Sequence, residues 1–174
     1  ALKAIGILRS LRYRVRSVTG DAEMTIQAGK TGVCATWFWD TGCTLPALGL
    51  LGDHETAGGA LRILIRGIQP DGTPPVTFER GTYQYSYQMP LLAWGAGHFL
   101  SACPDRTLLA EIYDPLSRYV RHWLERYRTP HGVVVHPPGM SCLDDAKRWQ
   151  PRQSLVPASG QPWTEVRGAP MRPH

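Results

Sequence analysis

The sequence lacks closely paired cysteines and contains no long apolar run, and both absences narrow the class of protein. None of its four cysteines forms a CxxC pair or a zinc-ligand spacing, so buried free thiols in a reducing compartment, the cytoplasm, are expected; they are Cys34, Cys43, Cys103 and Cys142. No apolar stretch approaches the roughly 20 residues that cross a membrane. The first residues also lack the pattern of a secretory leader. We therefore expect no membrane partner.

Common catalytic and metal-binding motifs are missing as well. The chain has no GxSxG nucleophile turn and no HExxH helix, and its six histidines include no pair one helical turn apart. The glycine pair around Ala96 is too short for a phosphate-binding loop. These absences argue against a serine hydrolase, a zinc hydrolase and a nucleotide-binding protein. We expect neither a cofactor nor a metal site.

Positive charge is in moderate excess, with a net charge of +5. This leaves open a basic helical domain that binds nucleic acid, whose signature would be steeply salt-dependent binding to any duplex. The densest basic run, Arg9–Arg16, contains only Tyr13 as an aromatic platform. A solvated charged face is the better interpretation of that run, so we expect no nucleic-acid partner.

Helical periodicity dominates residues 44–128, and 43% of all residues are hydrophobic, enough for a core. Asp53 is a typical N-cap for a helix whose apolar face has steps of three and four: Ala57, Ala60, Leu61, Leu64, Ile65 and Ile68. Other expected helices are 1–11, a short one with Pro46 in its first turn, 90–102, a short one after Asp105, and a fresh one from Asp114-Pro115 to about 128.

Strand alternation is scarce, which argues against a βαβ fold and favours an all-α class. Residues 72–86 are expected to form a loop because they contain Pro74, Pro75 and Gly81. Residues 1–149 are expected to form the folded domain. Residues 150–174 show no apolar period and are expected to be a disordered tail.

Unusual residues gather where loops meet helices. Trp37, Phe38, Trp39 and Asp40 place three aromatics beside a carboxylate. Aromatic faces match the C–H faces of a pyranose ring, and a carboxylate accepts hydrogen bonds from sugar hydroxyls. An aromatic core plug with Asp as a helix cap explains the same residues equally well.

A second aromatic cluster comes just before the helix at Pro90. It consists of Tyr83, Tyr85, Tyr87 and Gln88. The residues alone favour an extended segment that packs its tyrosines on a neighbour.

A third segment, Ser141–Trp149, holds Asp144 and Asp145 beside Lys147 and Arg148. Adjacent charges of both signs are usually a surface ion-pair cluster. A carboxyl beside aromatics can instead have a raised pKa and donate a proton. Spacing does not choose between these two interpretations.

Four segments in order resemble glycoside hydrolase family 63 and its relatives, which include bacterial mannosylglycerate hydrolase and processing α-glucosidase I. They are Trp37–Asp40, Asp71–Pro74, Gln88–Leu91, and Ser141–Asp145 with Arg148-Trp149. The family fold is a six-pair helical barrel, (α/α)6, with its active site in the loops at one end. The resemblance spans roughly residues 20–149 and implies an all-α partial toroid, about half of a complete barrel.

The resemblance also implies roles for single residues. The family inverts the anomeric configuration with one acid and one base. Asp144 matches the general acid, and Gln88 matches a substrate-binding glutamine. Trp37, Trp39 and Asp40 match residues that line the sugar subsite, and Tyr87 is placed with them as a neighbour of Gln88. The expected function is an inverting α-glycosidase acting on a small glucosyl or mannosyl substrate, with a carbohydrate as partner.

Two departures from the family pattern matter. Cys142 stands where the family usually has glycine, and nothing after Trp149 resembles the region that carries the catalytic glutamate. The 174 residues alone are therefore expected not to turn over substrate. The alternative function is a non-catalytic carbohydrate-binding remnant. Half a barrel should also leave Leu61, Leu64 and Ile68 without all their neighbours, so self-association is expected.

Overall fold

The computed structural model describes residues 2–27, 35–85, 88–132 and 134. It divides the chain into two compact units, residues 1–126 and residues 127–174. In the second unit, the described structure beyond the last helical residue is a single antiparallel bridge between Arg128 and Val134. The candidate site residues that the structure describes, Trp37, Trp39, Asp40 and Gln88, lie in the first unit.

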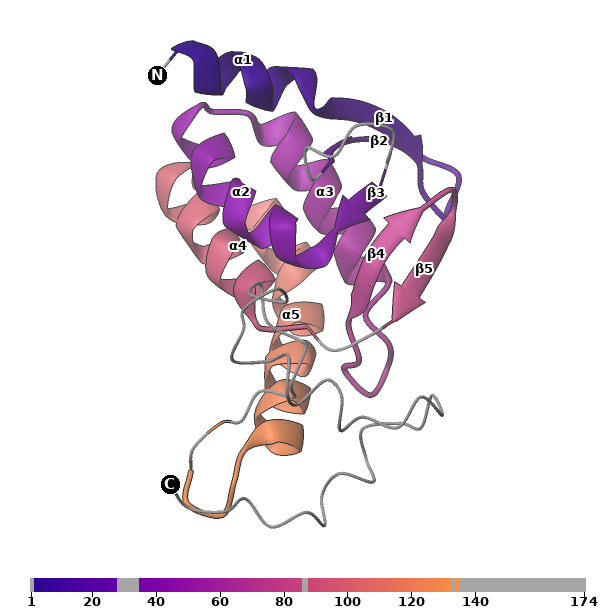
Figure 1. Ribbon diagram of the computed structural model, residues 1–174, viewed down its shortest axis with the longest axis vertical. Coiled ribbons are helices and arrows are strands. Elements are labelled where there is room, and N and C mark those ends of the chain that lie inside the picture. Colours follow the sequence, from indigo (N-terminus) through magenta and orange to yellow (C-terminus); the bar gives the residue numbers. More distant parts are fainter. Residues whose placement is uncertain (1, 28–34, 86–87, 133, 135–174) are drawn as a thin grey trace, which may run out of the picture. The chain divides into compact units, whose positions relative to one another are not determined.

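Five helices and two small antiparallel sheets make up the described fold (Figure 1). The helices are α1 (Leu2–Ser10), α2 (Phe38–Leu50), α3 (His54–Arg66), α4 (Leu91–Ala102) and α5 (Arg106–Tyr127). The strands are β1 (Arg12–Arg16), β2 (Ala22–Ile26), β3 (Ala35–Trp37), β4 (Pro75–Glu79) and β5 (Thr82–Tyr85). The expected helices at 1–11, 53–68 and 90–102 are confirmed within a few residues at each end.

Two caps work as the sequence predicts. Asp53 Oδ1 accepts a hydrogen bond from the main-chain N–H of Thr56 at 3.2 Å, at the start of α3. Asp105 Oδ1 accepts one from the main-chain N–H of Leu108 at 3.0 Å, at the start of α5. Each carboxylate satisfies a donor that has no partner inside its helix.

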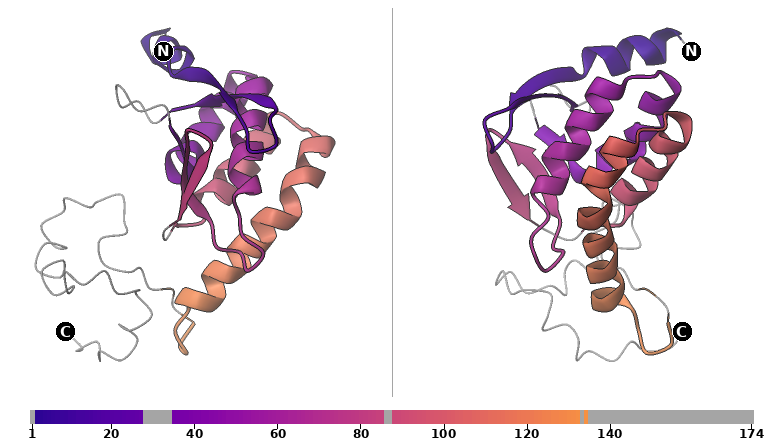
Figure 2. Two further views of the ribbon diagram at one scale, coloured as in Figure 1. Left: turned by 90° about the vertical axis from the view of Figure 1, so that its right-hand side faces the viewer. Right: turned by 180° about the vertical axis from the view of Figure 1, so that it is seen from behind.

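The strands show that the all-α prediction was too narrow. β1 and β2 form a hairpin in which Arg12 lies opposite Ile26, and β3, β4 and β5 form a three-stranded sheet in that order. In the basic run of β1, arginines alternate with Tyr13 and Val15, which is the period of a strand. Arg12 forms an ion pair with Asp53 at 3.4 Å, so this face of the strand is held against the start of α3 (Figure 2).

The expected loop at 72–86 is instead mainly the β4–β5 hairpin. Pro75 occupies the first position of its strand, where proline is tolerated. Arg80 and Gly81 form the two-residue turn between Glu79 and Thr82, with φ of 50° and 82°. Two positive φ angles are the mark of a type I′ hairpin turn, which suits the twist of the flanking strands.

Two helix boundaries inferred from proline were wrong. α2 starts eight residues before Pro46, and α5 continues through Asp114-Pro115 without a break. A proline inside a helix costs about 3 kcal/mol. In α5, however, Ile112, Leu116 and Tyr119 are buried on both sides of the proline, and their packing outweighs that cost.

Helices α2 and α4 run parallel in close contact. A Cβ at Gly42 would overlap the main chain of Leu91, and one at Gly49 would touch Phe99 and Ala102 at the other end of α4. Early residues of α2 thus meet early residues of α4. The N-terminal ends of both helices lie at the same end of the unit.

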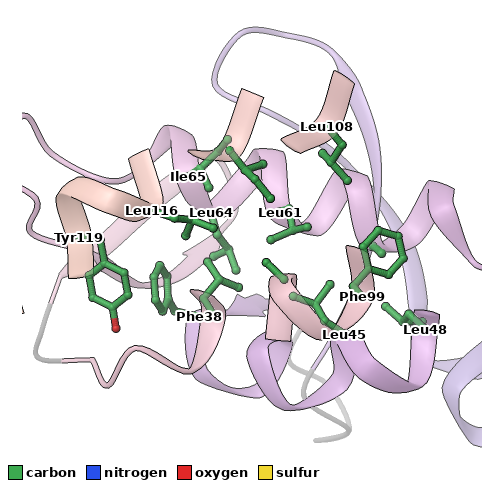
Figure 3. Close-up of a cluster of buried hydrophobic side chains, with 14 of the residues drawn as sticks. Phe38, Leu45, Leu48, Leu61, Leu64, Ile65, Phe99, Leu108, Leu116 and Tyr119 are labelled. Carbon is green, nitrogen blue, oxygen red and sulfur yellow. The ribbon is translucent and has the colours of Figure 1, made fainter. Parts of the chain in front are cut away.

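The core lies between α2, α3, α4 and α5 (Figure 3). Phe38 and Tyr119 lie at one end of the cluster, and Leu48, Phe99 and Leu108 at the other, so α5 runs antiparallel to α2. Leu61 and Leu64 are 0% exposed and Ile68 is 6% exposed. The expectation that these three lack neighbours was wrong, because the other helices and the sheets cover α3.

Candidate functional site

The aromatic triplet before Asp40 divides between core and surface. Phe38 is fully buried, while Trp37 and Trp39 are half-buried and Asp40 is exposed. Trp37 ends β3, and Phe38 opens α2. Successive residues in a helix point about 100° apart, so burying Phe38 turns Trp39 and Asp40 toward other directions. The burial of Phe38 therefore agrees with the core interpretation for that residue, and the sugar-site interpretation of Trp37, Trp39 and Asp40 stays a prediction.

Asp40 does not cap α2. The N-cap is Trp37, which makes no side-chain capping hydrogen bond, and Asp40 lies in the first helical turn. There a carboxylate interacts favourably with the helix dipole. Its main-chain oxygen accepts a hydrogen bond from Thr44 Oγ1 at 2.7 Å, and its carboxylate lies on the exposed side.

Gln88 lies in the segment just before α4. It is 6% exposed and precedes the first residue of α4 by three positions. The hydroxyl of Tyr119, in α5, donates to the main-chain oxygen of Gln88 at 3.1 Å. The ring of Tyr119 also meets the ring of Phe38 edge-on, with centroids 5.1 Å apart and planes at 82° (Figure 3). Tyr119 thus contacts both segments that hold candidate sugar ligands.

Tyr83 of β5 contacts both its own sheet and α3. Tyr83 packs on Phe78, with ring centroids 4.8 Å apart, and its hydroxyl donates to the main-chain oxygen of Ile63 at 2.5 Å. Burial raises the pKa of Tyr83 to about 12. The extended-segment interpretation therefore holds for Tyr83. Tyr87, the neighbour of Gln88, lies outside the described residues.

The Asp71–Pro74 segment forms a turn. Asp71 Oδ1 accepts from the main-chain N–H of Thr73, and Oδ2 accepts from its hydroxyl, both at 2.8 Å. The main-chain hydrogen bond lowers the pKa of Asp71 below its usual range. Gly72 has φ of 90°, and a Cβ there would overlap the main chain of Arg118 in α5. In this chain the segment forms a tight turn that packs closely against α5.

The predicted general acid, Asp144, lies outside the described residues, as do Asp145 and Arg148. The convergence of Asp144 with the tryptophans and Gln88 therefore stays a prediction. Across the described ranges, no three side chains of the His, Cys, Asp or Glu type gather closely enough to hold a metal ion. The helices described within these ranges are all too short or too polar to cross a bilayer.

A family comparison decides the assignment. The sequence model described as "Mannosylglycerate hydrolase MGH1-like glycoside hydrolase domain" matches residues 34–174. The chain belongs to this family. The match includes Trp37, Gln88 and Asp144, and it agrees with the family 63 resemblance of the four segments.

Solved structures agree with the family in fold. A mannosylglycerate hydrolase of glycoside hydrolase family 63 from Thermus thermophilus, in complex with glucose, superposes with a TM-score of 0.64 at 22% identity, over 92% of this chain and 42% of its own. An uncharacterized conserved protein from the same organism gives 0.65 at 24% identity, over 93% and 41%. The chain thus spans about two fifths of the length of each. A search of curated proteins finds no match.

The resemblance pointed to Gln88 and the tryptophans but gave no role to Tyr119. The sequence held one signal for it. Tyr119 is a hydroxyl-bearing residue within an otherwise apolar stripe of α5, and a buried tyrosine hydroxyl usually finds a hydrogen-bond partner. The identity of that partner, 31 residues away in the chain, could not be read from the stripe.

Proposed function

We propose that this MGH1-like domain is part of an inverting glycoside hydrolase that acts on small glucosyl or mannosyl substrates such as mannosylglycerate. The observation that carries the proposal is that Trp39, Asp40 and Gln88 belong to the adjoining N-terminal ends of two parallel helices, joined through Tyr119. Half-buried aromatics beside a carboxylate and an amide are suited to a sugar ring with its hydroxyls. The glucose held by the family 63 neighbour supports the same ligand class.

In the proposed mechanism, Asp144 protonates the leaving oxygen of the glycosidic bond. A carboxylate base from the part of the domain that lies beyond the matched two fifths of the relatives activates water on the opposite face of the sugar. Inversion requires these two carboxyl groups about 6.5–9.5 Å apart, with room for the water between them. The pocket must be partly desolvated to keep the acid protonated near neutral pH.

A glucose titration of the chain, followed by calorimetry or saturation-transfer NMR, tests the sugar site. Trp39→Ala should weaken binding roughly fivefold, because an aromatic face contributes about 1 kcal/mol. The matched control is Trp94→Ala, since Trp94 is 51% exposed on α4 and its tilted ring has its centroid 4.5 Å from that of His98. Equal losses in both variants, or no binding by the wild type, would contradict the site.

The alternative function is carbohydrate binding without hydrolysis. Both functions predict that the wild type binds glucose, so only a measurement of hydrolysis distinguishes them. A protein that carries the downstream half of the domain should release mannose from mannosylglycerate with inversion at the anomeric carbon. Sugar binding without any release by that longer protein would favour the alternative.

The partial-barrel proposal is supported by an uncovered apolar groove between α4 and α5. The groove has a volume of about 560 Å³ and is lined by residues such as Ala96, Leu109 and Tyr113. Leu109 is 45% exposed and Tyr113 is 63% exposed. In the longer relatives, further helices of the same barrel would cover such a face. In this chain we expect the groove to drive self-association, which Leu109→Lys should reduce in sedimentation velocity. A wild-type monomer at all concentrations would contradict this.

A further inference from the structure

One buried side chain links the two segments that carry the candidate sugar ligands. Tyr119 is 0% exposed. Its hydroxyl donates to the main-chain oxygen of Gln88 at 3.1 Å, and its ring packs edge-on against Phe38 at 5.1 Å. α5 thereby contacts the segment before α4 and the first turn of α2 through a single residue.

The hydrogen bond acts where the backbone is not fixed by regular structure. Gln88 lies in the short stretch between β5 and α4, so neither a helical nor a strand pattern sets the orientation of its peptide. A donor on the carbonyl of Gln88 fixes the peptide plane between Gln88 and Met89. That plane restricts where the Cβ of Gln88 can lie, and with it the directions open to the side chain.

The ring contact acts on the other segment. Phe38 stands between Trp37 and Trp39, and its edge-on contact with Tyr119 helps to fix the rotation of the first turn of α2 about the helix axis. Trp39 and Asp40 leave that turn at angles fixed relative to Phe38. The same tyrosine therefore contacts both halves of the candidate site and constrains their orientation.

We propose that Tyr119 is a positioning residue for the sugar site, holding Gln88 and the Trp39-Asp40 turn in one mutual orientation without touching the sugar. The proposal rests on the proposed function, because the orientation of these residues affects binding only if they hold a sugar. It assigns a positioning task to a residue of the core.

Tyr119→Phe tests the proposal, because it removes the hydroxyl and keeps the ring against Phe38. The matched control is Tyr83→Phe, since the Tyr83 hydroxyl also donates to a main-chain oxygen, that of Ile63 in α3. Both variants should lose stability to a similar extent in denaturant unfolding. Only Tyr119→Phe should bind glucose more weakly, by roughly 3- to 10-fold, the worth of one hydrogen bond.

A spectroscopic readout separates positioning from general loosening. Gln88-Met89 is the only Gln-Met pair in the sequence. Labelling glutamine with ¹³C at the carbonyl and methionine with ¹⁵N therefore gives one correlation signal, which reports the Gln88 carbonyl. This signal should shift in Tyr119→Phe and stay in place in Tyr83→Phe.

The outcomes distinguish the two proposals. If the wild type binds glucose and Tyr119→Phe binds it equally well with an unmoved Gln88 carbonyl signal, the positioning role is overturned and the function stands. Equal weakening of binding by both tyrosine variants would also overturn it, because stability alone would then explain the loss. If the wild type binds no glucose, the function fails at that first step, and the positioning role fails with it.

Discussion

Gly95 of α4 lies directly against the carbonyl oxygen of Gly42 in α2, so closely that any Cβ at residue 95 would overlap it. Residue 46, which would normally donate its main-chain N–H to this oxygen, is proline. The carbonyl freed by Pro46 therefore faces the Cα of Gly95. A glycine in one helix and a proline in the other together permit the parallel pair that carries the candidate site.

Gly95→Ala should destabilise the fold by about 1–3 kcal/mol, the usual cost of overpacking. The matched control lies two residues away, where a Cβ at Gly97 would meet nothing within 4 Å. Gly97→Ala should be neutral or stabilising by up to roughly 1 kcal/mol, because alanine favours the helix. Urea unfolding of both variants measures the contrast. A stable Gly95→Ala protein would mean that α2 and α4 are farther apart than described.

Asp53 combines a helix cap with an ion pair, and two substitutions separate these contributions. Asp53→Ala should lose about 0.5–2 kcal/mol, because the Thr56 N–H at the start of α3 loses its acceptor. Asp53→Asn keeps an acceptor and loses only the pair with Arg12 at 3.4 Å, about 0.2–1 kcal/mol. Thermal unfolding in low and high salt measures both.

Measurements in low and high salt test whether the losses of stability are correctly assigned to the cap and to the ion pair of Asp53. The deficit of Asp53→Asn should shrink in part at high salt, because the side chains of Arg12 and Asp53 are 29% and 16% exposed and salt screens a partly buried pair less than an exposed one. The deficit of Asp53→Ala should largely remain. Identical losses for the two variants would show that the cap contributes nothing.

The turn at Asp71 predicts a pH dependence of stability. Its pKa is lowered in the folded state by the hydrogen bond from Thr73. The stabilisation is thus present above the ordinary aspartate pKa of about 3.9 and is lost as the pH falls through the lower folded value. Asp71→Asn should be less stable than the wild type at neutral pH, and the gap should narrow in acid.

Unfolding midpoints measured from neutral pH to below about pH 3 test the Asp71 prediction. Asp114→Asn, at an exposed position of α5, controls for the general loss of one negative charge. A gap between the wild type and Asp71→Asn that did not change with pH would contradict the role of this carboxylate in the turn.

The acid assignment predicts a contrast between two neighbouring residues. In a protein that also carries the downstream half of the domain, Asp144→Asn should lower turnover by about 10²- to 10⁴-fold, the usual contribution of general acid catalysis. The loss should be much smaller for a substrate whose leaving group departs without protonation. Asp145→Asn should cost little, because we assign Asp145 to a structural hydrogen bond or ion pair.

Steady-state rates on substrates with good and poor leaving groups measure this contrast. If Asp145→Asn abolished activity while Asp144→Asn did not, the alignment of this segment with the family motif would be displaced by one residue.

Local patterns determined much of this protein from its sequence alone. The apolar period and the Asp53 cap predicted α3, and Pro90 predicted the start of α4, because caps and turns depend on neighbouring residues only. The order of the four segments indicated the family that the comparison then showed. The roles of Trp37, Trp39, Asp40, Gln88, Tyr87 and Asp144 remain proposals.

Tertiary structure alone decided the features that depend on distant partners. α5 continues through Pro115 because buried residues on both sides of it outweigh the local cost. The place of β1 against α3 is decided by the ion pair between Arg12 and Asp53. Phe38, and not the tryptophan on either side of it, faces the core, where it packs in the cluster between the helices and meets the ring of Tyr119. In each case the deciding energy comes from contacts between residues far apart in the chain, and no pattern of neighbouring residues encodes them.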